Sequence, residues 1–162
     1  CLGDSFDDLD ASTSLTQTNR QDLARMKAGR RWIWIEGNHD PGPIGLGGTH
    51  LAEQAISPIV FRHIATNTRT EDGEISGHYH PKLTLHMKGR SITRRCFALD
   101  DTRLIMPAYG TYTGGLSVHS DPLTELLSED ALCILTGKQA LPVSRAQSRK
   151  SKIRTPSRHS VA

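Results

Sequence analysis

Side chains that could bind a metal ion occupy the segment Gly37-Asn38-His39-Asp40, which follows an apolar run at residues 31–36. The amide oxygen of Asn38 can bind a cation, and the imidazole of His39 can bind a cation or exchange a proton. Gly37 permits a sharp turn of the backbone immediately before them. The segment therefore predicts a loop that presents polar side chains at the end of a strand.

Carboxylates and imidazoles also lie at the ends of three other predicted strands. They are Asp4 and Asp7 after residues 1–3, His63 in residues 59–64, and His78 and His80 after residues 74–76. His78 and His80 are two residues apart, so on an extended chain both point the same way. A single histidine at a strand end is also common as a packed or exposed residue, so His63 alone does not define a ligand.

The pattern around these side chains predicts an α/β fold. Residues 1–3 indicate the end of a strand, residues 20–28 a helix capped by Asn19, and residues 31–36 a second strand. Strand, helix and strand in this order are typical of a parallel βαβ unit, which places ligands at the carboxyl ends of its strands. Asp4 and Asn38 are both predicted to lie there.

The remaining sequence is rich in predicted strands. They cover residues 59–64, 74–76, 83–87, 91–99, 103–106 and 131–135, with turn residues between them. Residues 41–48 are rich in Gly and Pro and predict a loop, and residues 49–55 predict a short helical turn. We expect a mixed sheet from the first half and a mostly antiparallel sheet from the second, stacked face to face with helices outside.

Charge divides the chain into two parts. Residues 138–162 carry seven Lys or Arg and no Asp or Glu, whereas residues 1–137 carry 13 basic and 17 acidic residues, a net charge of −4. We therefore expect one domain over residues 1–137 and a basic, disordered tail over residues 138–162. Such a tail could contact nucleic-acid phosphates or simply be a solvated end.

Two further features bear on the setting of the protein. No apolar run is long enough to span a bilayer and no leader precedes the first motif, which predicts a cytoplasmic protein. The three cysteines, Cys1, Cys96 and Cys133, lack a CxxC spacing, so we expect free thiols, with Cys96 and Cys133 buried on strands.

Together these motifs resemble those of the calcineurin-like metallophosphoesterase superfamily. Residues 32–41, 47–50, 61–63, 75–81 and 107–116 more closely resemble bacterial DNA ligase-associated metallophosphoesterases. The resemblance implies an α/β/β/α sandwich of two mixed sheets flanked by helices, here lacking its first strand. It also implies a metal-dependent phosphodiesterase or nuclease of DNA repair, acting on DNA beside a DNA ligase, a helicase and a nuclease.

The same resemblance assigns roles to the site residues. Asp4 would bridge two divalent cations, with Asn38, His63 and His78 completing one and His80 binding the other. The family suggests Mn²⁺, and the mixed donors also suit Fe or Zn²⁺. Two cations about 3.5–4 Å apart would generate a shared hydroxide that attacks phosphorus. His39 would protonate the leaving oxygen, with Asp40 orienting it and Asp7 holding water or a hydrogen bond nearby.

One motif of the superfamily is missing from the sequence. Asp-x-His, which supplies two ligands on the first strand, occurs nowhere in it. We therefore expect an N-terminally shortened member that is weak or inactive unless another segment supplies those ligands. Alternative functions are a phosphatase, a cyclic-nucleotide phosphodiesterase, or a non-catalytic module that binds nucleic acid or protein.

Overall fold

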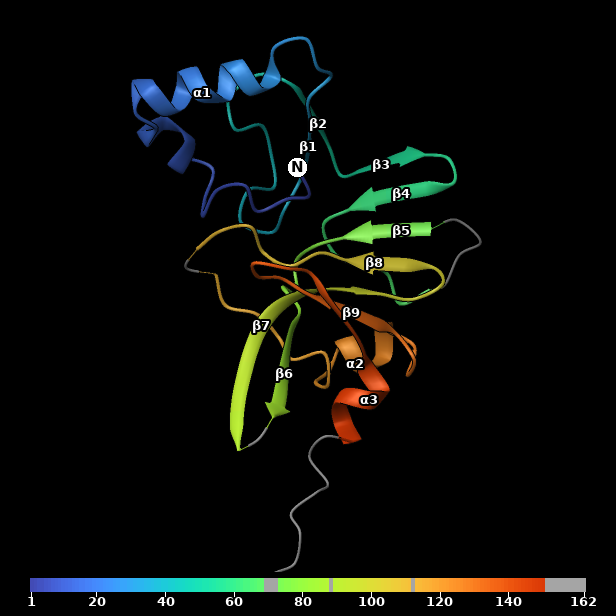
Figure 1. The fold of residues 1–162 in the computed structure, drawn as a ribbon. Helices are drawn as coiled ribbons and strands as arrows, with labels where there is room; N and C mark the ends of the chain where they lie inside the picture. The colour runs from blue at the N-terminus through green and yellow to red at the C-terminus, as the bar shows by residue number, and fades with distance from the viewer. Residues whose placement is uncertain (69–72, 88, 112, 151–162) are drawn as a thin grey trace, which may run out of the picture.

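The computed structural model describes residues 1–68, 73–87, 89–111 and 113–150 (Figure 1). In its N-terminal part, strand β1 (Ile33–Ile35) pairs in parallel with β2 (Thr49–Leu51). On the other edge of β1, Leu2 forms a parallel bridge with Ile35. The predicted strand–helix–strand unit is therefore parallel, with residues 1–2 in the place of its first strand.

Helix α1 (Gln17–Lys27) connects residues 1–2 to β1, after a short 3₁₀ helix, η1 (Ala11–Ser14). The prediction that Asn19 caps the helix is wrong. Thr16 is the cap, because its hydroxyl accepts a hydrogen bond from the backbone N–H of Asn19 at 3.2 Å. The helix ends before Gly29, whose φ of +69° is left-handed.

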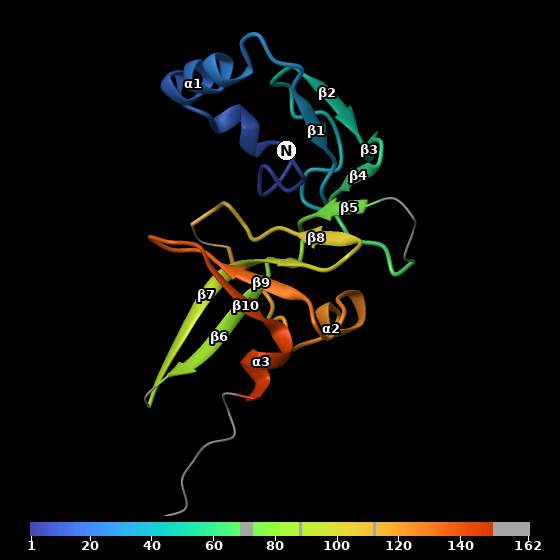
Figure 2. The same ribbon diagram turned by 45° about the vertical axis from the view of Figure 1, so that its right-hand side comes forward.

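The second sheet has the strand order β10-β9-β7-β8-β5-β4-β3 in the described residues, and β6 pairs with β7 beside this path (Figures 1 and 2). Its strands are β3 (Glu53–Ile56), β4 (Ile59–Arg62), β5 (Gly73–Ser76), β6 (Lys82–Met87), β7 (Arg90–Leu99), β8 (Arg103–Ile105), β9 (Leu132–Leu135) and β10 (Leu141–Ser144). Strands β4, β5 and β8 are parallel neighbours, and the other pairs are antiparallel. Because parallel strands end at one edge, the residues that follow β4 and β5 come together there.

The main core lies where β6 to β9 meet helix α2 (Leu123–Leu126). Its members are Ala65, Leu83, Cys96, Ala98, Ile105, Val118, Leu123, Leu126, Leu127, Ala131, Cys133 and Leu135. Cys96 and Cys133 are buried free thiols on β7 and β9, as predicted, whereas Cys1 is exposed. The prediction of a mixed α/β fold with two sheets is confirmed.

Two predictions about local structure are wrong. Residues 49–55 form β2 and β3 instead of a helical turn, because each finds a partner strand in β1 or β4. Residues 138–150 are not a disordered tail, since residues 141–150 within them form β10 and helix α3 (Arg145–Lys150). The rest of the predicted tail, residues 151–162, lies outside the described residues.

Arg145 explains why a basic segment can belong to the fold. Its side chain is buried, and its guanidinium donates hydrogen bonds of 2.9 Å to the backbone carbonyls of Val118, Leu127 and Ser128. A buried guanidinium with three such acceptors is satisfied without a carboxylate. This arginine is therefore a structural residue and is not free to contact phosphates.

In the described part of the chain, the helices are too short or too polar to cross a membrane.

Candidate metal centre

Loops from four parts of the chain meet at one edge of the two sheets. Residue 4 follows the bridge at Leu2, Asn38 follows β1, His63 follows β4, and His78 follows β5. Figures 1 and 2 show the N-terminal segment beside the ends of β4 and β5. The predicted convergence of Asp4 and Asn38 at the carboxyl ends of parallel strands is found, together with His63 and His78.

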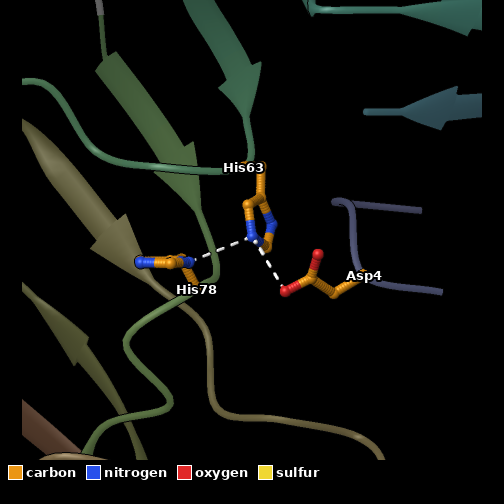
Figure 3. Close-up of side chains that lie close together, drawn as sticks. All are labelled: Asp4, His63 and His78. Carbon is orange, nitrogen blue, oxygen red and sulfur yellow. Dashed lines mark hydrogen bonds and ion pairs between the residues drawn. The ribbon is translucent and has the colours of Figure 1, made fainter. Parts of the chain in front are cut away.

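His63 lies at the middle of this cluster. Its Nε2 atom is 3.1 Å from each of three atoms, Oδ2 of Asp4, Oδ1 of Asn38 and Nδ1 of His78. Figure 3 shows the imidazole of His63 between the carboxylate of Asp4 and the ring of His78. The ligand atoms of Asp4, His63 and His78 all lie within 4.8 Å of one another.

The tautomer of His63 decides what this cluster can bind. Its Nδ1–H donates to the backbone carbonyl of Leu2 at 2.7 Å, so in the neutral ring Nε2 carries a lone pair. That lone pair then faces the oxygens of Asp4 and Asn38, which also carry lone pairs. A cation satisfies all of them at once, and ligands at about 2.1 Å and right angles lie about 3 Å apart. The donor set therefore fits a divalent cation.

The backbone at three of the candidate site residues has an unusual conformation. Asp4, His78 and His80 have φ values of +47°, +59° and +48°, and in the described residues no other non-glycine residue has a positive φ. A left-handed conformation is costly for residues with a Cβ atom and often marks a functional site. All three are residues that the sequence predicts as metal ligands, so the strain coincides with the candidate site.

Asp40 joins the two loops that carry Asp4 and Asn38. It is 4% exposed, and its carboxylate accepts hydrogen bonds from the backbone N–H groups of Asp4 (2.9 Å), Ser5 (2.8 Å), Phe6 (3.3 Å) and Gly37 (3.1 Å). The sequence predicts that Asp40 orients His39, but these bonds direct its carboxylate to the backbone instead. Asp40 therefore holds together the loops that carry Asp4 and Asn38.

Close approach of the same two loops requires glycine. A Cβ atom on Gly37 would lie 2.1 Å from Oδ1 and 2.2 Å from the backbone nitrogen of Asp4. A Cβ atom on Gly3 would lie 2.5 Å from Nδ1 of His63. The motifs Gly3-Asp4 and Gly37-Asn38 thus contain glycine because a side chain there would displace His63 or Asp4.

His39 and Asp7 lie at the exposed side of the centre. The backbone N–H of His39 donates to Oδ1 of Asp4 at 2.9 Å, and its Nδ1 lies 3.2 Å from the backbone carbonyl of Asp7. Both residues are exposed. The group of Asp7 in this contact with the imidazole is its main-chain carbonyl.

Burial and neighbouring groups affect two of the histidines. Desolvation lowers the pKa of His78, and His63 lowers it further, while Asp4 acts in the opposite direction. Desolvation likewise lowers the pKa of His80, with His78 next in effect. His80 therefore lies near the centre, although it is outside the group of Asp4, His63 and His78. Lowered pKa values favour the neutral imidazoles that bind metals.

Arg62 is a residue beside the centre that the sequence analysis did not single out. Its side chain forms ion pairs with Glu53 at 3.2 Å and with the buried Glu74 at 3.4 Å. It helps to line an open depression of ≈ 380 Å³, formed with Glu36, Gly37, Asn38, Ala52, Glu53, His63 and Ile64. The sequence signal that could have identified Arg62 is its position directly before His63.

The fold is a metallophosphoesterase-like sandwich of two sheets. Among solved structures, the chain is similar to the crystal structure of Pseudomonas putida nuclease MPE, with a TM-score of 0.64 and 24% sequence identity. The likeness covers 88% of this chain and 68% of that one. No protein-family model and no curated protein matches the sequence.

Proposed function

We propose that this chain is a metal-dependent phosphodiesterase of the nuclease type. The observation that carries the proposal is the position of Asp4, Asn38 and His78, each 3.1 Å from Nε2 of His63. The likeness in fold to Pseudomonas putida nuclease MPE supports the same activity. Hydrolysis of phosphodiesters is a reaction that divalent cations promote at such sites.

The residues present suggest how metal would be held. Asp4, Asn38, His63 and His78 would hold one divalent cation, for which we propose Mn²⁺, with Fe or Zn²⁺ compatible with the same donors. A second cation would share Asp4 and take His80, and would need further ligands. Bound cations would polarise the phosphate oxygens and supply a water of lowered pKa.

The side chains of the chain itself would position the groups and move a proton. His39 is the proposed general acid for the leaving oxygen. Since Nδ1–H can donate to the carbonyl of Asp7, the proton to be transferred is the one on Nε2 of His39. The hydrogen bond from the backbone N–H of His39 to Asp4 keeps this residue beside the metal ligands. Asp40 would act by holding both loops in place.

The proposed substrate is DNA, and the proposed setting is a repair system with a DNA ligase, a helicase and a nuclease. Two observations support this finer proposal. They are the resemblance of residues 32–41 and 107–116 to ligase-associated enzymes and the similarity in fold to a protein that is named as a nuclease.

Hydrolysis of bis-p-nitrophenyl phosphate and of p-nitrophenyl phosphate, with Mn²⁺ after treatment with EDTA, tests the proposal. We expect faster hydrolysis of the diester, and loss of about 100-fold or more of this rate in Asp4→Asn, because that residue contacts the cation. Asp22→Asn, at an exposed site on α1, is the matched control. Faster hydrolysis of the monoester would favour a phosphatase instead.

Elemental analysis of the same samples distinguishes the proposed enzyme from a non-catalytic binding module. Bound Mn²⁺ without hydrolysis of either ester would overturn the enzymatic proposal in favour of a binding module. Two tightly bound ions per chain would contradict the expectation of a weak enzyme that lacks ligands for the second ion.

A further inference from the structure

We infer that a basic groove beside His80 binds the sugar-phosphate backbone of a single-stranded nucleic acid next to the bond to be cleaved. The inference rests on the proposed function only in taking nucleic acid as the substrate. The groove has a volume of ≈ 440 Å³ and is lined by Lys82, Thr93, Arg94, Arg95, Thr136 and Gly137. Three of these six residues are basic and none is acidic.

Two of the basic residues face each other across neighbouring strands. Lys82 on β6 is the direct cross-strand partner of Arg95 on β7. Like charges in this relation repel each other, so the pair destabilises the hairpin unless an anion lies between them. Within the described residues, neither Lys82 nor Arg95 forms an ion pair with a carboxylate. Loop carbonyls already accept hydrogen bonds from the guanidinium of Arg95, so the ammonium group of Lys82 is the charge that a phosphate group would balance.

The groove begins at the metal centre. Lys82 is two residues from His80, and the segment at Gly115 touches both of them. A Cβ atom on Gly115 would lie 2.2 Å from the carbonyl oxygen of His80 and 2.9 Å from Cε of Lys82. The charge of Arg95 also acts on the imidazole of His80. A nucleic-acid strand with one phosphate at the metals would therefore run toward Lys82 and the exposed Arg94 in the lining of the groove.

An exposed aromatic side chain lies in the loop that Arg95 holds. The guanidinium of Arg95 donates to the carbonyls of Ala108 at 3.1 Å and Thr111 at 3.0 Å, on either side of Tyr109. The side chain of Tyr109 is fully exposed, at 103% of its reference area. Surfaces that bind single strands combine a basic groove with aromatic rings on which bases stack. This combination favours a single strand over a duplex.

Fluorescence anisotropy with a 5′-fluorescein-labelled twelve-nucleotide oligo-dT, in EDTA to prevent metal-dependent cleavage, tests the groove. We expect Lys82→Gln and Arg94→Gln each to weaken binding about tenfold at low salt. Each should reduce the slope of log Kd against log salt by about 0.7, because one phosphate contact is lost. Tyr109→Ala should weaken binding about tenfold without changing this slope, because stacking is not ionic.

Arg90→Gln is the matched control, because Arg90 is an exposed arginine at the first residue of β7 and does not line the groove. We expect its binding to equal that of the wild type. Equal losses in Arg90→Gln and Lys82→Gln, no loss in Lys82→Gln and Arg94→Gln, or tighter binding of duplex than of oligo-dT would overturn the inference.

The two proposals can fail separately. A protein that hydrolyses bis-p-nitrophenyl phosphate but binds oligo-dT without using Lys82 and Arg94 retains the proposed function and loses the groove. A protein that binds oligo-dT through Lys82 and Arg94 but hydrolyses no ester retains the groove and loses the proposed enzymatic function.

Discussion

At the scale of single residues, the candidate centre depends on the state of its imidazoles. His63 presents the lone pair of Nε2 because Nδ1–H is bound to the carbonyl of Leu2. His78 and His80 have lowered pKa values, chiefly because both are partly buried. The fold thus disfavours the protonated rings that would repel a cation.

These lowered pKa values predict how stability depends on pH in the metal-free protein. An imidazole with a lower pKa in the folded state than its unfolded value of about 6.5 binds fewer protons when folded. The free energy of unfolding should therefore fall as the pH drops below about 6.5. Urea unfolding in EDTA at pH 7.5 and 5.5 measures this change.

His78→Gln should show a smaller decrease between the two pH values than the wild type. His86→Gln, on β6, is the control and should show the same decrease as the wild type. A wild-type protein more stable at pH 5.5, or an undiminished decrease in His78→Gln, would contradict the assignment.

The residue types of the centre were predictable, but part of its geometry was not. Asp4, Asn38, His63 and His78 stand in motifs that can be recognised in the sequence. The partner that fixes the tautomer of His63 is a main-chain carbonyl 61 residues away, and every residue has such a carbonyl. No residue type in the sequence could therefore indicate Leu2.

At the scale of elements, the centre depends on how the strand-end loops are joined. The carboxylate of Asp40 connects the loop after residue 3 to the loop after β1 through four backbone N–H groups. Carboxylate acceptors make hydrogen bonds that are stronger than neutral ones. One buried side chain thus sets the distance between Asp4 and Asn38.

Asp40→Asn should weaken this connection. An amide offers one acceptor oxygen, so its NH₂ group would face backbone donors that then lack a partner. We expect a loss of about 2–4 kcal/mol in the free energy of unfolding, measured with urea at pH 7.5. Mn²⁺ affinity should fall with it. Asp22→Asn should change stability little, because its ion pair with Arg25 is exposed, and equal losses in both variants would refute the role of Asp40.

The elements that could be predicted are those with apolar, β-branched runs. Strands β4, β5, β7 and β9 lie within or close to their predicted ranges. β4 is half-buried throughout, and burial alternates along β5, β9 and the second half of β7. Strands β2, β3 and β10 begin with exposed residues and contain no buried one. They exist because a neighbouring strand is available for pairing, which local sequence does not encode.

At the scale of the whole molecule, the C-terminal segment is part of the structural framework. Strand β10 forms an edge of the large sheet beside β9, and Arg145 connects α3 to the loops at Val118 and Leu127. Removing residues 138–162 would therefore remove a strand and a buried arginine, and would not test a nucleic-acid-binding tail alone.

Arg145→Lys tests this structural role. A lysine cannot reproduce the planar fork that reaches three carbonyls, so we expect a loss of about 2–3 kcal/mol in the free energy of unfolding. Arg149→Gln is the control, since that side chain is about half exposed, with a 4.0 Å contact to Glu129 and a 3.2 Å hydrogen bond to Nδ1 of His119. Chemical denaturation of both variants measures this loss. An unchanged free energy of unfolding in Arg145→Lys would show that the three carbonyls do not need the guanidinium.

Metal binding should also stabilise the whole molecule, because its proposed ligands come from segments that are far apart in sequence. An unfolded chain does not hold residues 4, 38, 63 and 78 together, so a cation binds the folded state preferentially. At a Mn²⁺ concentration of 100 times Kd this gives about 2.7 kcal/mol, or a rise of roughly 5–10 °C in Tm for a chain of this size. Calorimetric scans with Mn²⁺ and with EDTA measure the shift, and Asn38→Ala should reduce it. A Tm that does not respond to Mn²⁺ would mean that the four side chains lie together without forming a metal site.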